Sequence, residues 1–156
     1  PGQDGLSPHG VYMVRLCLGG RWQNIVVDDR LPCIGGGSYY TQLAYCVTNR
    51  RQLWASLIEK AFAKVCGSFE VVAGGEAGEA LTIFTGWPCT LIRIARPDFD
   101  PDMLWATLCS SKDSQFLMTC STGPIRPEDE QSLVPNHVYS LLDVYEVERL
   151  AAAEEE

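Results

Sequence analysis

The sequence predicts an α+β fold, in which strands and helices are mixed without a regular alternation of strand and helix. Two β-type runs are separated only by Gly19-Gly20, a pattern that indicates a hairpin. Further along, segment 51–66 carries apolar residues at helical spacing. The chain has 156 residues, of which 46% are hydrophobic, enough for a core in one ordinary domain or in two small lobes.

The first half of the chain is predicted to form a hairpin followed by a long helix. Residues 11–18 and 22–27 alternate as strands do. A short strand at 39–40 is expected after a glycine-rich loop. The helix over 51–66 should end at Gly67, because glycine accepts the left-handed conformation of a helix cap.

The second half is predicted to contain shorter elements. A short helix near 77–84 comes first, and a short strand at 91–94 follows it. A helix of about three turns begins at Pro101, since proline is tolerated in the first turn. Residues 116–120 read as a strand, and a final strand carries His137.

Composition excludes several classes of function. The net charge is −8 and the basic residues are scattered, which argues against a nucleic-acid groove. No apolar run is long enough to span a membrane, and no secretory signal opens the chain. No nucleic acid and no membrane are therefore expected as partners, and the oligomeric state is not readable.

The seven cysteines have no regular spacing and form no CxxC pair. Zinc sites need grouped cysteine and histidine ligands, so no metal site is expected. We interpret the cysteines as mostly buried free thiols of a protein in a reducing compartment. The cytoplasm is therefore the predicted location.

Three other patterns have simpler structural interpretations. Segment 74–78, GGEAG, lacks the Lys-Ser/Thr of a phosphate loop. Asp28-Asp29 could be a carboxylate pair, but paired acids at a strand end more often form a turn. Tryptophans could form a recognition platform, although beside an amphipathic helix they are more often core residues. These tryptophans are Trp54, Trp87 and Trp105.

His137 is the candidate functional residue, and it is one of only two histidines. An imidazole at the start of a strand suits a general base, because its pKa lies near working pH and its position is fixed. The alternative interpretation is a histidine that merely packs or hydrogen-bonds at a strand end.

Several segments together resemble the calpain family of cysteine proteases. The similarity covers about residues 10–148, and the helix motif is specific. The matching segments are 22–32 (WQNIVVDDRLP), 53–64 (LWASLIEKAFAK), 67–70 (GSFE), 84–86 (FTG) and 137–140 (HVYS). Segments 104–106, 110–113 and 116–118 look most like the small-optic-lobes branch of that family.

The resemblance implies a papain-like core of two lobes around a cleft, present here only in part. Residues 1–86 would be the end of the first lobe, and residues 87–156 the start of the second. His137 would be the general base that deprotonates a cysteine thiol, while an asparagine orients its ring. Trp54 and Phe62 would anchor the long helix to the sheet. The parent would be an intracellular endopeptidase that cuts proteins at limited sites.

The chain departs from the family pattern at both catalytic partners of the histidine. The Gly-Asp-Cys-Trp nucleophile motif would precede the first strand, and the Asn-Pro-Trp-Gly motif would follow the last. We therefore expect a protease fragment that is inactive alone. Gln52 stands where conventional calpains have an acidic calcium ligand, so no cofactor is expected here, although calcium is possible in the complete parent core.

Two other functions stay open at this point. One is a non-catalytic interaction module that kept a calpain-like shell, which the missing triad members favour. The other is an α+β domain with an incidental histidine. A cysteine in the Gly-Asp-Cys-Trp position of the parent would favour the protease.

Overall fold

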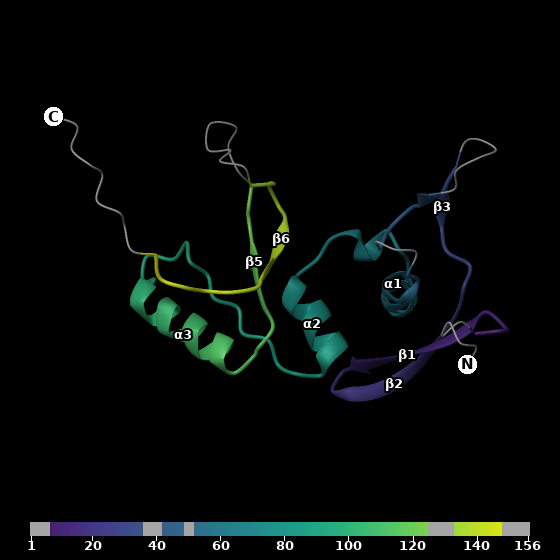
Figure 1. Cartoon of the computed structure of the whole chain (residues 1–156), viewed down its shortest axis with the longest axis horizontal. Helices are drawn as coiled ribbons and strands as arrows, with labels where there is room; N and C mark the ends of the chain where they lie inside the picture. Colours follow the sequence, from purple (N-terminus) through teal and green to yellow (C-terminus); the bar gives the residue numbers. More distant parts are fainter. Residues whose placement is uncertain (1–6, 36–41, 49–51, 125–132, 148–156) are drawn as a thin grey trace. The chain divides into compact units, whose positions relative to one another are not determined.

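The computed structural model describes residues 7–35, 42–48, 52–124 and 133–147 (Figure 1). The chain divides into two compact units, residues 1–91 and 92–156. Each unit contains both helix and strand, which confirms the α+β class. The predicted lobe boundary after residue 86 stays a prediction.

The first unit opens with the predicted hairpin. Strand β1 (Val11–Leu18) pairs antiparallel with β2 (Arg21–Asp28) along their whole length. Gly19 and Gly20 have φ values of 56° and 75°. A two-residue turn needs two positive φ angles to match the twist of its strands, and glycine adopts them without steric cost.

One face of this hairpin packs against helix α1 (Trp54–Cys66) and forms the core of the unit. Leu16 and Val27 come from the strands, Leu57 and Ala61 from the helix, and none of the four is more than 6% exposed. Among the described residues this is the main apolar cluster, so it carries most of the hydrophobic stabilisation of the unit.

Helix α1 has two apolar stripes instead of one. The stripe that faces the hairpin repeats every four residues and consists of Leu53, Leu57, Ala61 and Val65. The second stripe lines a groove and consists of Trp54, Ile58 and Phe62. The predicted anchoring of the helix to the sheet by Trp54 is wrong, because its side chain is 61% exposed. Phe62 instead packs on Phe84 of helix α2 (Ala77–Thr85), with ring centroids 5.3 Å apart.

Helix α1 begins later along the chain than predicted. The carbonyl oxygen of Gln52 accepts the hydroxyl of Thr48. The first helical bond runs from the N–H of Leu57 to the carbonyl of Leu53, at 3.0 Å. The helix begins at Trp54, three residues after the predicted start. Its predicted end is confirmed, since Gly67 has a φ of 118° and donates to a carbonyl of the last turn.

Two lysines of α1 tie the helix to β2. Lys60 Nζ lies 2.5 Å from Asp28 Oδ1 and 3.1 Å from the carbonyl oxygen of Asp28. Lys64 Nζ donates to the carbonyl of Val26 at 2.7 Å. Asp28 Oδ1 also accepts the N–H of Arg30 at 2.9 Å, which confirms the turn interpretation of this acidic pair. The hydrogen bond from Lys60 lowers the pKa of Asp28.

The rest of the first unit consists of short elements. Strands β3 (Cys33–Ile34) and β4 (Gln42–Leu43) pair antiparallel and were not predicted. The predicted strand at 39–40 lies outside the described residues. A single 3-10 turn, η2 (Val71–Ala73), precedes α2, whose predicted position is confirmed.

The second unit holds one helix and one hairpin. Helix α3 (Pro101–Asp113) begins as predicted, with the Asp100 side chain accepting two backbone N–H groups of the first turn. This cap satisfies donors that have no partner within the helix. Strands β5 (Met118–Ser121) and β6 (Val138–Leu141) pair antiparallel. No described residue of this unit is fully buried.

The predicted strand at 91–94 is wrong. Leu91, Ile92 and Ile94 are 63%, 42% and 65% exposed, and the described chain forms no strand there. An apolar run becomes a strand only where another strand pairs with its backbone, and no such partner is present in the described chain.

The seven cysteines are all free thiols, as predicted, but most of them are not buried. Cys17 is the buried one; Cys46, Cys66 and Cys109 are half-buried, whereas Cys33, Cys89 and Cys120 are exposed. In the residues that the structure describes, no helix is both long enough and apolar enough to cross a bilayer.

Candidate active site

His137 lies directly before β6, so the strand begins one residue later than predicted. The ladder of β5 and β6 ends with Ser121 opposite Val138, and Thr122 and His137 come next in the same register. The side chain of His137 is exposed. An imidazole in this position is open to a reaction partner and is not sealed in the interior.

The backbone of His137 is fixed by Thr122 on both sides of the residue. The N–H of Thr122 donates to the carbonyl of His137 at 2.9 Å. The N–H of His137 donates to the hydroxyl oxygen of Thr122 at 3.0 Å. That hydroxyl lies 2.6 Å from the carbonyl of Val134, to which it donates. The backbone N–H and C=O of His137 are therefore both held by hydrogen bonds, although the ring is exposed to solvent.

The residue before the histidine has an unusual backbone. Asn136 has a φ of 50°, a left-handed conformation that asparagine tolerates better than most residues. Its N–H donates to the carbonyl of Gly123 at 3.0 Å, which continues the pairing of the two segments. This bend sets the direction in which the chain enters His137.

The ring of His137 packs against one aromatic neighbour. Its centroid lies 4.9 Å from that of Tyr139, and the two planes meet at 76°. The Tyr139 hydroxyl accepts the N–H of Val134 at 2.8 Å, so the tyrosine ring is held at its far end. An edge-to-face contact of this kind restricts the rotamers of the imidazole.

In the described part of the second unit, no cysteine thiol is hydrogen-bonded to His137. Cys120 stands opposite Tyr139 in the ladder and is therefore a diagonal neighbour of His137. A general base works through a direct hydrogen bond to the thiol, at about 2.6–3.2 Å between heavy atoms. Among the described residues, no hydrogen bond joins Cys120 to His137.

Cys46, in the first unit, is unsuited to nucleophilic attack for an electrostatic reason. Burial, together with the carboxylate of Glu59, raises the pKa of the Cys46 thiol. The Glu59 carboxylate also accepts the N–H of Cys46, at 2.9 Å. Because the thiolate is the reactive form, a raised pKa makes the cysteine inert. This agrees with the sequence interpretation of the cysteines as structural.

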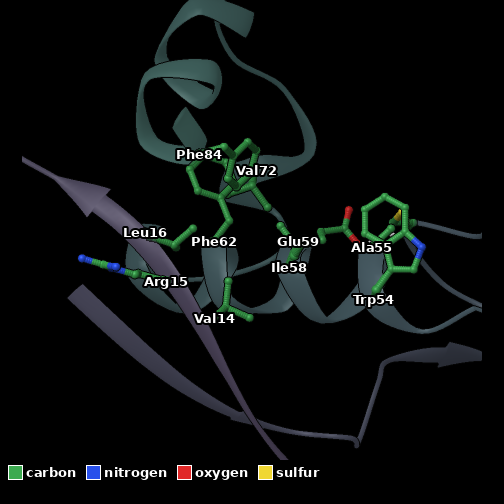
Figure 2. A pocket seen from close by; sticks show the side chains of 11 residues that line it. Val14, Arg15, Leu16, Trp54, Ala55, Ile58, Glu59, Phe62, Val72 and Phe84 are labelled. Carbon is green, nitrogen blue, oxygen red and sulfur yellow. Dashed lines mark hydrogen bonds between the residues drawn. The ribbon is translucent and has the colours of Figure 1, made fainter. Parts of the chain in front are cut away.

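The first unit carries an apolar groove of about 510 Å³. Figure 2 shows Phe62, Val72 and Phe84 gathered at one end of it and Trp54 at the other. Glu59 supplies the carboxylate of its lining, and that group already accepts a hydrogen bond. Apart from Arg15, Cys46 and Glu59, the lining consists of apolar side chains.

Gln52 stands at the position discussed above as a possible calcium ligand, and its side chain is hydrogen-bonded within the chain. The side-chain oxygen of Gln52 accepts the indole N–H of Trp54 at 3.1 Å. Within the described ranges, no group of three or more His, Cys, Asp or Glu side chains is arranged to hold a metal ion.

Comparison with known proteins identifies relatives along almost the whole chain. The family model described as calpain family cysteine protease matches residues 3–155. The chain is 35% identical over 150 residues to the calpain-type cysteine protease DEK1 of Zea mays, covering 91% of this chain. It is 32% identical over 147 residues to the calpain-like protease palB of Emericella nidulans, again covering 91% of this chain. With calpain-12 of Homo sapiens, the identity is 33% over 150 residues and 94% of this chain.

The match is much shorter than these relatives themselves. The chain spans 7% of the length of DEK1, 17% of palB and 20% of calpain-12.

Proposed function

Because the chain belongs to the calpain family of cysteine proteases, we propose that it forms part of a protease catalytic core in which His137 is the general base. The observation that carries this proposal is the placement of His137. Its backbone is fixed on both sides by Thr122, while its imidazole is open to solvent. A rigid base with an accessible ring is what proton transfer from a thiol requires.

In the proposed mechanism, the thiol and the orienting asparagine come from segments of the parent protein beyond this chain. The imidazole of His137 takes the proton of the cysteine S–H, and the resulting thiolate attacks the scissile carbonyl carbon. The imidazolium then gives its proton to the leaving amine as the C–N bond breaks, which leaves an acyl-enzyme. Water hydrolyses the acyl-enzyme with His137 again acting as base. The chain alone therefore hydrolyses no peptide bond.

Three finer assignments belong to this proposal. The parent is a member of the small-optic-lobes branch, supported by the segments 104–106, 110–113 and 116–118. It acts on protein substrates in the cytoplasm, supported by seven free thiols with no disulfide. The chain itself holds no tight calcium site, because Gln52 offers a neutral oxygen where charge determines affinity.

The test uses the full-length parent protein and a fluorescently labelled protein substrate. Replacing His137 by alanine should lower kcat/KM by about 100- to 10,000-fold, the contribution of a general base. His9 is the only other histidine, and it is exposed, so His9→Ala is the matched control and should leave kcat/KM unchanged. Cleavage that survives His137→Ala would overturn the proposal.

A non-catalytic interaction module is the second candidate, and the apolar groove of the first unit favours it. An epoxide inhibitor of thiol proteases separates the two functions, because it alkylates only an activated cysteine. Covalent labelling of the full-length parent supports the protease. An unlabelled and inactive parent supports the module.

A further inference from the structure

We propose that Thr122 is a positioning residue for His137, and that its hydroxyl fixes the position of the imidazole for proton transfer. The inference rests on the proposed role of His137 as general base. The hydrogen bonds of Thr122 to His137 all go to the backbone of the histidine and none to its imidazole. The effect of Thr122 reaches the reaction only through the backbone of the histidine.

The geometry assigns three backbone partners to one threonine. Thr122 binds the carbonyl of His137 through its own N–H at 2.9 Å, and it accepts the N–H of His137 on its hydroxyl at 3.0 Å. The hydroxyl has a single proton, and the carbonyl of Val134 at 2.6 Å is a closer acceptor than that of His137 at 3.3 Å. The hydroxyl therefore accepts one hydrogen bond, from the N–H of His137, and donates one, to the carbonyl of Val134.

The hydroxyl replaces a bond that an ordinary ladder would make. Directly opposite residues in a hydrogen-bonded antiparallel pair exchange two backbone bonds, N–H to C=O in both directions. Here only one of the two is made by the backbone, because the N–H of His137 points to the Thr122 side chain. The left-handed φ of 50° at Asn136 immediately precedes this peptide and turns it out of the regular ladder.

Val134 and Tyr139 connect Thr122 to the imidazole ring through a second series of contacts. Val134 is bound at its carbonyl by Thr122 and at its N–H by the hydroxyl of Tyr139. Tyr139 in turn contacts the imidazole edge to face. The segment that leads into His137 is thus held at Val134, at the histidine backbone and at the ring, and Thr122 makes two of these contacts.

Removing the hydroxyl leaves the N–H of His137 without this acceptor. Thr122→Val keeps the shape of the side chain, so it removes the hydrogen bonds with little change in volume. A displacement of about 1 Å in a reacting group can cost about 100-fold in rate. We therefore expect a 10- to 100-fold loss of kcat with little change in KM, because substrate contacts are not altered.

The experiment measures kcat and KM of the full-length parent with Thr122→Val, Thr122→Ala and Thr122→Ser. Both variants without a hydroxyl should lose kcat, whereas serine restores it to within about threefold, as a hydroxyl-specific role requires. Thr119→Val is the matched control and should keep wild-type kcat. Thr119 lies in the same strand, its side chain is exposed, and its hydroxyl bonds to no other described residue.

A second readout separates positioning from general loss of structure. The rate at which iodoacetamide alkylates the nucleophilic cysteine near pH 6 reports the thiolate that the imidazole maintains. It should fall in the valine and alanine variants and recover with serine. Circular dichroism of each variant identifies those that fold.

Each outcome decides between the proposals. A folded valine or alanine variant with wild-type kcat overturns the positioning role. If both fail to fold while serine folds, the hydroxyl serves folding and the positioning role is also overturned. If His137→Ala leaves activity intact, the general-base assignment fails, whatever the Thr122 variants do.

Discussion

Gly86 is the position at which a single methyl group should be most informative about the first unit. It follows α2 with a φ of 74°, and its N–H donates to the carbonyl of Thr82 at 2.8 Å. A Cβ at this position would lie 2.8 Å from Cζ2 of Trp22 and 3.5 Å from Sγ of Cys17. Gly86→Ala therefore meets both backbone strain and a steric clash.

The size of the effect follows from three contributions. A left-handed conformation costs an L-residue about 1–2 kcal/mol. Relieving the clash moves the Trp22 ring, over which the Arg15 guanidinium lies at 5.2 Å, a contact of about 0.5–1 kcal/mol at exposed sites. Alanine regains about 0.4–1 kcal/mol by restricting the unfolded chain. The net expectation is a loss of about 0.5–2.5 kcal/mol in the free energy of unfolding.

The assay is urea unfolding of the chain, followed by far-ultraviolet circular dichroism. Gly74→Ala is the matched control, because Gly74 has an extended φ of −146° and no atom within 4 Å of an added Cβ. The control should be neutral or slightly stabilised. Repeating Gly86→Ala in a Trp22→Leu background should recover only the part due to the clash. Equal midpoints for the two glycine variants would refute the reasoning.

Three further outcomes follow from the packing and charges. Leu16→Ala should lower the free energy of unfolding by about 2–4 kcal/mol, since Leu16 is only 1% exposed; a loss under about 1 kcal/mol would contradict its place in the core. Thiol labelling near neutral pH should modify the exposed Cys120 much faster than Cys46, whose pKa is raised by burial and by a nearby carboxylate, and mass spectrometry of timed samples measures both rates. The Lys112–Asp143 pair, joined at 2.5 Å, should release the segment after β6 in acid, because its hydrogen bond lowers the pKa of Asp143 below the ordinary 3.8. That stabilisation is complete above pH 3.8 and is lost as pH falls through the lowered value, so amide exchange in this segment should rise there. Lys112→Met should weaken the dependence, and the part due to the N–H of Val144, which also donates to Asp143 Oδ1, should remain.

The sequence was a good guide to elements whose partners are adjacent in the chain. The first hairpin follows from alternation around two glycines, and α3 from the proline at its start. The strand predicted at 91–94 failed because an apolar run does not specify a pairing partner. The prediction that Trp54 anchors the helix to the sheet failed for a different reason. Helix α1 has two apolar stripes, and periodicity does not say which of them meets the sheet.

The candidate site shows the same limit. His137 was found because histidine is rare in this chain and because its surroundings resemble a family motif. Thr122 was not singled out, since its relation to His137 depends on the register between two segments that are fifteen residues apart. That register is a property of the folded hairpin, and a hydroxyl in a Ser-Thr pair is too common a signal to reveal it.

The lysines of α1 have a consequence for how this chain meets other chains. The carbonyls of Val26 and Asp28 that they bind lie on the margin of β2 that no strand covers in the described residues. An incoming strand from a neighbouring molecule would need those same acceptors, and it would first have to displace two ammonium groups. Lys60 and Lys64 therefore disfavour the addition of a strand from another molecule along this margin. Acetylating both lysines would favour aggregation there.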